Sequence, residues 1–398
     1  MACKALSGQG LAFDLIMAED IRAGVLKEYA MLFVPGGWAS NKSSALGEEG
    51  LRAIRDFVQS GGSYLGFCGG AGLATKAKGC LGLLDIKRRP TKERVPSFSG
   101  RIHLNIDRHQ IWKAPSTVSR QPSADVFHAW WPSQFMIEDK GIKVLATYGD
   151  ALPDAFSSDL NVGDIEGSGG WKAHEELYGI NLDPARLKNE PCVLEGRYGR
   201  GRVILSLIHF DTPGDLNGQR VLVNLWKYLG GDQDISEERK CGSAEGKTAG
   251  PSDSDASELF DLCSGLIALG ERNFLWFWRN PMLLQWRRGV RGLEYNTLYI
   301  MMKEISAMIM SRDDNARLLF APALGKIRAL LVPFIEKAEH LLILERRAMQ
   351  KGPVTYDKCD DPGIQRLREE LFSTSKSYGG MFKELLDEMC GVLFTMIR

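Results

Sequence analysis

The stretch GSYLGFCGGAGLA, Gly62 to Ala74, joins a short apolar run to a segment of small residues. The apolar run, Ser63 to Phe67, predicts a buried strand, and the small residues after Cys68 predict the start of a helix. A turn that presents a nucleophile between a strand and a helix strains the backbone of that residue, so its neighbours must be small. Glycines flank Cys68 on both sides. We therefore predict a nucleophile elbow with Cys68 at its tip.

The chemistry expected of Cys68 follows from this position. Backbone N–H groups at the start of a helix point toward the sulfur, which lowers the pKa of a thiol and increases its thiolate fraction. The alternative is a glycine-rich turn that carries a cysteine by chance. The other cysteines form neither a C-x-x-C pair nor a Cys/His cluster at metal spacing, and they lie at positions 3, 80, 192, 241, 263, 359 and 390. We expect those to be small reduced side chains, and we expect no metal site and no cofactor.

A second glycine-rich turn precedes the elbow. The apolar run Ala30 to Val34 predicts a strand that ends at Pro35-Gly36-Gly37, and the segment from Leu46 to Gln59 has one apolar face and predicts a helix. Free N–H groups of Gly36 and Gly37, together with that of Gly69, are candidates to hold an oxyanion beside Cys68. The alternative is an ordinary turn in which glycine supplies a positive φ.

The candidate base is His209. The run VILSLI, Val203 to Ile208, predicts an apolar strand, and His209 follows it directly, with Asp211 two residues later. Alternating side-chain directions would point His209 and Asp211 the same way, so that the carboxylate could orient the imidazole. The other histidines, at positions 103, 109, 128, 174 and 340, lack such a setting. The predicted triad is therefore Cys68, His209 and Asp211.

The pattern along the chain predicts two domains. From Phe13 to about Gly230, apolar runs alternate with amphipathic segments, as in an α/β fold; extended segments include Gly100 to Ile106, Ala124 to Trp131 and Gly141 to Tyr148, and a hairpin turns at Gly199-Arg200-Gly201. Residues 231–256 lack apolar periodicity and are expected to form a linker. Residues 257–398 have helical periodicity throughout, which predicts an all-α bundle of about five helices.

The beginning of the chain departs from a doubly wound α/β pattern. Residues ACKALSGQGL, Ala2 to Leu11, resemble the first helix of such a fold, and FDLIM, Phe13 to Met17, is expected to be a strand. The central first strand of such a sheet is therefore either missing from this chain or replaced by another segment.

Overall composition sets limits on function. The chain has 398 residues, with 50 basic and 50 acidic side chains, so no global charge attracts it to nucleic acid or to an anionic membrane. We find no uncharged apolar run of eighteen residues and no secretory signal pattern at the start. The expected protein is cytoplasmic, has no transmembrane segment and does not bind nucleic acid.

The quoted motifs resemble a known family. The segments LFVPGG, FVQSGG, YLGFCGGA and GRYGRGRVILSLIHFD look like the class I glutamine amidotransferase-like superfamily, in particular the amino-terminal domain associated with biotin-protein ligase. The resemblance covers roughly residues 1–230 and is strongest at the elbow and at PGG. It implies a flavodoxin-like sheet with a Cys-His-acid triad, which maps onto Cys68, His209 and Asp211.

Several positions depart from the family pattern. Glutamine amidotransferases usually carry a glutamine soon after the nucleophile, where this chain has Gly70, Ala71 and Gly72, and their acid is usually a glutamate, where this chain has Asp211. No synthase domain that could accept ammonia follows, so glutaminase activity is not predicted. A ligase would need a lysine-bearing adenylation motif such as KWPND, which is absent, so the chain is not a biotin ligase.

Three other segments have two interpretations each. HAWWPSQF, His128 to Phe135, either lines a substrate cleft or packs in the core. The basic stretch Lys87 to Arg101 is either a solvated loop or an anion-binding surface. The aromatic and arginine-rich segment Phe274 to Tyr295, in which Asn280-Pro281 suggests a helix start, is either part of the bundle core or a surface for a protein partner or a second copy.

Two hypotheses for function follow. In the first, the protein is a cysteine hydrolase or amidotransferase that acts on a C–N bond of an unknown small molecule, with Cys68 as nucleophile, His209 as base, and Gly37 and Gly69 at the oxyanion. In the second, it is a catalytically silent module that binds a ligand, and its helices bind a partner. The reactivity of the Cys68 thiolate distinguishes them.

Overall fold

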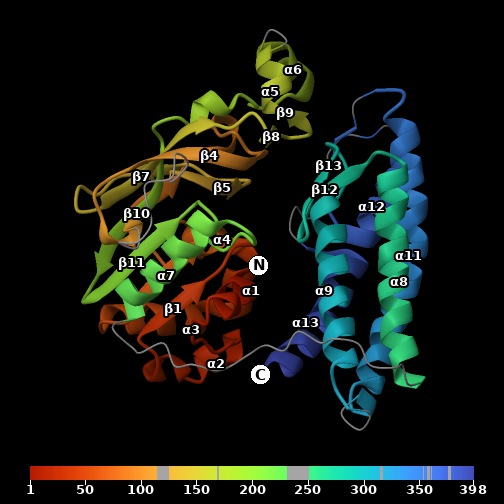
Figure 1. Ribbon diagram of the computed structural model, residues 1–398, viewed down its shortest axis with the longest axis horizontal. Coiled ribbons are helices and arrows are strands. Elements are labelled where there is room, and N and C mark those ends of the chain that lie inside the picture. Colours follow the sequence, from red (N-terminus) through yellow and green to blue (C-terminus); the bar gives the residue numbers. More distant parts are fainter. Residues whose placement is uncertain are drawn as a thin grey trace. The chain divides into compact units, whose positions relative to one another are not determined.

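The computed structural model describes residues 1–113, 125–167, 170–230, 251–313, 317–352, 354–355, 359, 361–374 and 378–398 (Figure 1). The chain divides into two compact units, Met1–Lys240 and Cys241–Arg398. The predicted linker, residues 231–256, spans this division, and its residues 231–250 lie outside the described part.

The first unit is built on one large mixed sheet (Figure 1). Its strands follow the order β1 (Met31–Val34), β2 (Ser63–Phe67), β11 (Gly201–Ser206), β10 (Pro191–Tyr198), β7 (Lys143–Ala151), β4 (Phe98–Ile106), β8 (Phe156–Ser157) and β9 (Leu160–Asn161), and β5 (Val126–Trp130) also pairs with β4. Strands β1, β2 and β11 run parallel to one another, as expected for a flavodoxin-like sheet. The pairs among β10, β7, β4, β5, β8 and β9 are antiparallel.

Helices and smaller elements complete this unit. They are α1 (Ala2–Gly8), α2 (Ala18–Arg22), α3 (Ala39–Gln59), α4 (Gly69–Leu73), α5 (Val162–Gly167), α6 (Lys172–Tyr178), α7 (Leu216–Gly230), the two-stranded sheet of β3 (Ile86–Arg88) and β6 (Phe135–Ile137), and four short 3-10 helices, η1 (Val25–Glu28), η2 (Thr91–Glu93), η3 (Gln110–Trp112) and η4 (Pro184–Leu187). Helices α4 and α7 pack on β2, and α3 packs on α4 and β11. The central parallel strands are thereby covered by the helices that follow them.

Several local predictions are confirmed. The expected strands at 30–34, 63–67, 100–106 and 141–148 correspond to β1, β2, β4 and β7, and the described part of 124–131 contains β5. Strands β10 and β11 form the expected antiparallel hairpin, with Gly199 in the left-handed region at φ 58°. The helix expected after the elbow is shorter than predicted, because α4 ends at Leu73 and the Leu73 carbonyl then accepts the Leu81 N–H.

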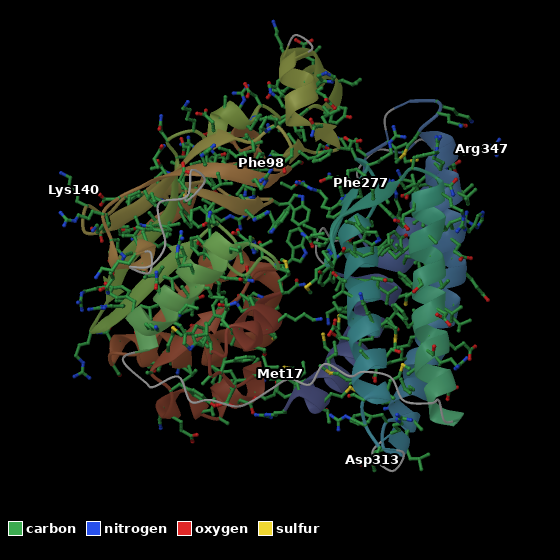
Figure 2. The ribbon with its side chains drawn as sticks, viewed as in Figure 1. Met17, Phe98, Lys140, Phe277, Asp313 and Arg347 are labelled. Carbon is green, nitrogen blue, oxygen red and sulfur yellow. The ribbon has the colours of Figure 1, made fainter. Side chains whose placement is uncertain are left out.

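The predicted strand at Phe13–Met17 is wrong. This segment has no regular secondary structure between α1 and α2. Its last residue, Met17, instead precedes the first turn of α2, where the Met17 N–H donates to the Asp20 carboxylate at 2.8 Å. Met17, which Figure 2 labels, is 40% exposed. An apolar run of five residues therefore did not suffice to make a strand here.

The second unit is mainly helical (Figure 1). Its helices are α8 (Pro251–Arg272), α9 (Gly292–Met310), α11 (Ala321–Ala348), α12 (Pro362–Phe372) and α13 (Gly380–Ile397). The expectation of an all-α domain is wrong at one place, where β12 (Trp276–Asn280) and β13 (Leu283–Trp286) form an antiparallel hairpin. Asn280 and Pro281 begin its turn and not a helix, because the Asn280 side chain accepts the Met282 N–H at 2.9 Å.

Each unit has its own apolar core. The first core surrounds the central strands and includes Leu65, Phe67, Phe98 and Ile204, of which Phe98 is labelled in Figure 2. The second core lies among the helices and includes Leu266, Ile305, Phe334 and Leu385. Among the described residues, every helix is too short or too polar to cross a membrane.

Candidate active site

Cys68 lies at the carboxyl end of β2, directly before α4. Its backbone has φ 47° and ψ −102°, a conformation that residues other than glycine rarely adopt. Two hydrogen bonds hold this turn, since the Cys68 N–H donates to the Ser206 carbonyl at 2.8 Å and the Gly72 N–H donates to the Cys68 carbonyl at 2.9 Å. The side chain remains partly exposed. The backbone is therefore the strained strand-to-helix turn that a nucleophile elbow requires.

Close backbone approach explains why small residues follow Cys68. A Cβ atom on Gly69 would lie 1.7 Å from the Gly37 carbonyl oxygen, so no side chain fits at that position. A Cβ atom on Gly36 would lie 2.9 Å from His209 Cε1 and 3.6 Å from Cys68 Cβ. The two glycine-rich turns therefore touch, and Gly36 faces both Cys68 and His209.

His209 lies farther from its strand than the sequence suggested. Strand β11 ends at Ser206, so His209 is three residues beyond it and does not follow the strand directly. The Ser206 hydroxyl accepts the Ile208 N–H at 3.0 Å, and the His209 N–H donates to the His128 carbonyl at 2.9 Å. These bonds replace regular strand pairing and fix the backbone that carries the imidazole.

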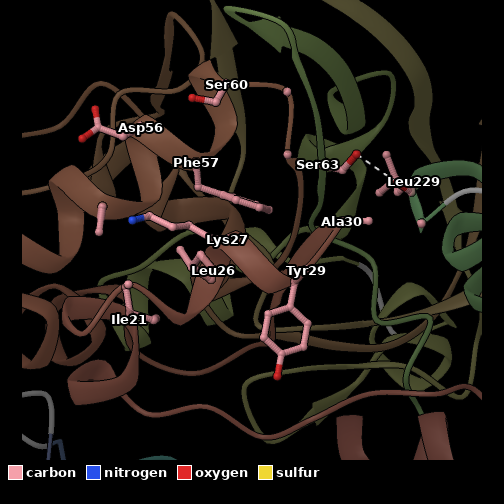
Figure 3. A pocket seen from close by; sticks show the side chains of 15 residues that line it. Ile21, Leu26, Lys27, Tyr29, Ala30, Asp56, Phe57, Ser60, Ser63 and Leu229 are labelled. Carbon is pink, nitrogen blue, oxygen red and sulfur yellow. Dashed lines mark hydrogen bonds between the residues drawn. The ribbon is translucent and has the colours of Figure 1, made fainter.

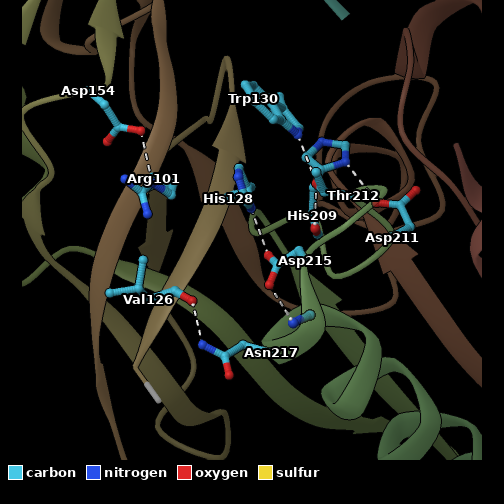
Figure 4. Close-up of polar contacts among 11 residues, drawn as sticks. Arg101, Val126, His128, Trp130, Asp154, His209, Asp211, Thr212, Asp215 and Asn217 are labelled. Atoms are coloured by element: carbon cyan, nitrogen blue, oxygen red, sulfur yellow. Dashed lines mark hydrogen bonds and ion pairs between the residues drawn. The ribbon is translucent and has the colours of Figure 1, made fainter. Parts of the chain in front are cut away.

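The structure brings His209 and Asp211 together (Figure 4). The distance from His209 Nδ1 to Asp211 Oδ1 is 3.0 Å, and the two residues are only 4% and 2% exposed. A turn produces this contact, not the alternation of an extended strand, because the Thr212 N–H donates to the His209 carbonyl at 3.1 Å. The other ring nitrogen, Nε2, lies on the side of Cys68, since a Cβ atom on Gly36 would be 3.7 Å from His209 Nε2 and 3.6 Å from Cys68 Cβ.

The electrostatics of these three groups favour their charged forms. Burial alone would raise the pKa of Cys68, but the hydrogen bond and charge of His209 and the Gly69 N–H outweigh it and lower that pKa. Burial alone would lower the pKa of His209, but Asp211 and Cys68 raise it to about 10. Burial alone would raise the pKa of Asp211, but the charge and hydrogen bond of His209 lower it. These shifts favour a thiolate on Cys68 and an imidazolium on His209 over the neutral pair.

Donors for an oxyanion lie next to the sulfur. The Gly69 N–H bonds to the Cys68 side chain. In the part of the chain that the structure describes, the N–H groups of Gly36, Gly37 and Trp38 have no hydrogen-bond acceptor. Successive free N–H groups in a turn form a concave binding site for an anion. The predicted oxyanion residues Gly36, Gly37 and Gly69 therefore lie in two touching turns beside Cys68.

Two supporting contacts could not be found from the sequence. Trp130 is buried and its Nε1–H donates at 2.9 Å to Thr212, whose hydroxyl donates to the His209 carbonyl at 2.8 Å (Figure 4). His128 stacks on Trp130, and its Nδ1 lies 2.7 Å from Asp215. The HAWW segment therefore supports the turn that carries His209, a role that needs partners more than 80 residues away in sequence.

Lys42 is a third residue that sequence reasoning did not select. It lies in the first turn of α3, and its Nζ would be 3.4 Å from a Cβ atom on Gly37. Burial lowers the pKa of its ammonium group, and the charge of Cys68 partly offsets this effect. Its position near the PGG turn could have been proposed from sequence, but not the direction of its side chain.

Two of the other histidines take part in separate contacts. His103 pairs with Asp125, and His109 lies 3.4 Å from Glu195, both away from the elbow. The described residues contain no group of three or more His, Cys, Asp or Glu side chains that could hold a metal ion.

A separate cavity of about 800 Å³ lies at the opposite edge of the sheet (Figure 3). Its lining includes Ala30 and Ser63, where β1 and β2 begin, and the Ser63 hydroxyl donates to the Leu229 carbonyl at 3.0 Å. Cys68 follows the other end of β2, so this cavity and the elbow are separated by the full length of that strand. The cavity is therefore not part of the candidate active site.

Comparison with known proteins confirms the resemblance suspected from the motifs. Residues 24–78 match the family described as "Biotin-protein ligase, N terminal", a span that runs from before β1 through Cys68 and α4. No curated protein sequence matches the chain.

Two solved structures are similar over 57% of this chain, each with a TM-score of 0.33. A glutamine amidotransferase is 18% identical, with 91% of its own chain covered, and a β-galactosidase from Bacillus circulans sp. alkalophilus is 14% identical, with 26% covered. Within the described first unit, the segment that carries the elbow is thus similar to the amino-terminal region of biotin-protein ligases.

Proposed function

We propose that the protein is a cysteine-dependent hydrolase or amidotransferase-like enzyme that cleaves a C–N bond of a small molecule. The observation that carries this proposal is the arrangement of a strained, partly exposed Cys68 beside the buried pair of His209 and Asp211. Burying the charged side chains of His209 and Asp211 costs free energy, and so does holding the Cys68 backbone at a positive φ. A cysteine with only a structural role would require neither. Nucleophilic catalysis gives a reason for both.

The proposed reaction has two halves. The Cys68 sulfur attacks the amide carbonyl carbon, and the oxygen becomes an oxyanion beside the N–H groups of Gly37 and Gly69. The C–N bond then breaks as His209 gives its proton to the leaving amine, and a thioester remains on Cys68. In the second half, His209 takes a proton from water, the hydroxide attacks the thioester, and the acid leaves as the C–S bond breaks. Asp211 keeps the imidazole oriented throughout.

The resemblance to biotin-protein ligase amino-terminal domains and the parallel β1–β2–β11 arrangement support a flavodoxin-like, amidotransferase-like fold for this unit. The chain lacks the glutamine that glutamine amidotransferases carry after the nucleophile, and Gly70 and Gly72 stand in that region. We therefore leave glutamine out of the proposed substrates.

The test is amine release from a panel of small primary and secondary amides by the full chain. We expect release of ammonia or amine from at least one compound, with an acyl-enzyme mass adduct on the Cys68 peptide. Cys68→Ala should abolish both. If Cys68 reacts with iodoacetamide no faster than a free thiol near neutral pH, and Cys68→Ala preserves the cellular function, the enzyme hypothesis fails and the silent binding module replaces it.

A further inference from the structure

Three cationic side chains gather around the elbow helix without acidic partners. They are Lys42 on α3, Arg88 on β3 and Arg94 after η2. Among the described residues, no Asp or Glu carboxylate lies within ion-pair distance of any of the three. Three other cations of the same basic stretch are paired: Lys87 bonds Glu138 at 2.7 Å, Arg89 bonds Glu190 at 2.8 Å and Arg101 bonds Asp154 at 2.9 Å.

The two arginines converge on one hydroxyl. Arg88 Nε donates to Ser133 Oγ at 3.2 Å, and Arg94 Nη1 donates to the same oxygen at 3.5 Å. The Arg94 Nε–H is buried and has no acceptor within the described residues. Burial, together with the charge of Arg88, lowers the pKa of Arg94. Arg94 Nη2 also donates to Thr91 Oγ1 at 2.6 Å, so the described partners of both guanidinium groups are neutral hydroxyls. Two guanidinium groups held this close repel each other, and an anion between them would offset that repulsion.

Contacts of Gly72 link the arginines to the lysine. A Cβ atom on Gly72 would lie 3.6 Å from Arg88 Nη1 and also 3.6 Å from Ala39 Cβ, so the guanidinium group lies beside the first turn of α3. Lys42 belongs to that turn. Gly72 is one helical turn from Cys68, whose carbonyl accepts its N–H. Arg88 thus lies beside the helix that begins at the nucleophile, Lys42 lies over the turn that touches this helix, and Arg94 joins Arg88 at Ser133.

The position of Lys42 is unfavourable without a ligand. The amino end of a helix carries a partial positive charge, so a lysine in the first turn of α3 adds to that charge instead of offsetting it. Its ammonium group lies over Gly37, next to the free N–H groups of the PGG turn. The side chain, the helix end and the turn all favour the same kind of ligand, one with negative oxygen atoms.

We propose that Lys42, Arg88 and Arg94 bind an oxyanion group of the substrate, a carboxylate or a phosphate, beside the carbonyl that Cys68 attacks. This inference rests on the proposed function and narrows it to C–N bonds in anionic small molecules. It also assigns a role to Arg88 and Arg94 of the basic stretch.

The test compares two alkylating reagents that differ in one charged group. Iodoacetate carries a carboxylate and iodoacetamide a neutral amide, and both transfer their carbon to a thiolate with loss of iodide. The rate of each is measured at Cys68 in the full chain, with the exposed Cys390 of the same chain as reference. We expect the iodoacetate-to-iodoacetamide rate ratio at Cys68 to exceed that at Cys390 by about tenfold, as expected for one charge-assisted hydrogen bond.

Variants identify the residues that produce this preference. Lys42→Met, Arg88→Met and Arg94→Met should each lower the ratio at Cys68 severalfold. Lys87→Met removes the same charge from the same stretch but from a cation paired with Glu138, and should leave the ratio unchanged. An equal effect of Lys87→Met, or a wild-type ratio equal to that of Cys390, contradicts the proposal.

Competition distinguishes the two sources of the anion. Protection of Cys68 against iodoacetamide by inorganic phosphate assigns a phosphate group, protection by succinate assigns a carboxylate, and protection by neither contradicts the proposal. The reagent pair also separates this inference from the proposed function. A Cys68 that reacts with iodoacetamide like an ordinary thiol overturns both, whereas a fast Cys68 without preference for iodoacetate overturns the anion site alone.

Discussion

The described part of the first unit holds three histidine–aspartate pairs. His103–Asp125 is partly exposed, whereas His209–Asp211 and His128–Asp215 lie on adjoining segments and differ in what surrounds them (Figure 4). The distances are similar, 3.0 Å for His209–Asp211 and 2.7 Å for His128–Asp215. The free side of the His209 ring meets Cys68, whereas His128 stacks on Trp130. We therefore expect a chemical role only for the pair that has a strained thiol beside it.

The two aspartates, Asp211 and Asp215, also differ in their hydrogen-bond partners. Asp211 has the imidazole of His209 as its side-chain partner, and both are buried. Asp215 also accepts the Gly218 N–H at 2.9 Å, which satisfies a donor in the first turn of α7. The pair of His128 and Asp215 thus joins β5 to the start of a helix and supports the fold.

The largest expected effect separates the two histidines. His209→Gln removes the proton-transfer group and should lower amine release by about 10²–10⁴-fold. His128→Gln should change it by no more than a few-fold, because His128 contacts neither Cys68 nor the reacting atoms. Initial rates at saturating substrate check this difference, and equal losses in the two variants would show that the comparison is mistaken.

A smaller effect is expected from the packing of the elbow. Gly69→Ala places a Cβ atom 1.7 Å from the Gly37 carbonyl oxygen and should destabilise the first unit by about 1–3 kcal/mol or more. Gly72→Ala is the matched control in the same helix, because its Cβ atom would meet nothing closer than 3.6 Å. Thermal unfolding midpoints provide the measurement. A Gly69→Ala midpoint as high as that of Gly72→Ala would argue against the close contact of the two turns.

The smallest effect is expected from Asp215. Asp215→Ala removes a hydrogen bond at the start of α7 and should cost about 1 kcal/mol of stability, with Cys68 reactivity unchanged. Asp211→Asn should have the opposite profile, a slower Cys68 with a smaller change in stability. Unfolding and alkylation of both variants test this, and loss of reactivity in Asp215→Ala would assign the pair of His128 and Asp215 to the site.

The elbow could be predicted because its signal is local. A strand, a cysteine and a run of small residues occupy thirteen consecutive positions, and the need for glycine beside the nucleophile follows from sterics alone. The contact between His209 and Asp211 was also anticipated, although a turn produces it and not an extended strand.

Other features depend on distant partners. The pair of His128 and Asp215 spans 87 residues, and the neighbours of Lys42 are set by how the PGG turn meets α4. The hairpin at Trp276–Trp286 was missed because closely spaced aromatic and arginine residues fit a helix as well as a strand, and its turn depends on the Asn280 side chain. Periodicity alone does not resolve such segments.

The central claim is that His209 holds Cys68 as a thiolate, and the pH dependence of Cys68 alkylation by iodoacetamide tests it most directly. Because the pKa of Cys68 is lowered, its reactivity should persist as the pH falls below the ordinary thiol value of about 8.5 and disappear only below the lowered pKa. Desolvation by its helix and the charge of Asp387 raise the pKa of Cys390 although its surface is exposed, so as the pH falls Cys390 should lose reactivity before Cys68 does. His209→Gln should move the Cys68 midpoint upward. A wild-type midpoint at or above 8.5, unchanged in His209→Gln, would contradict the account.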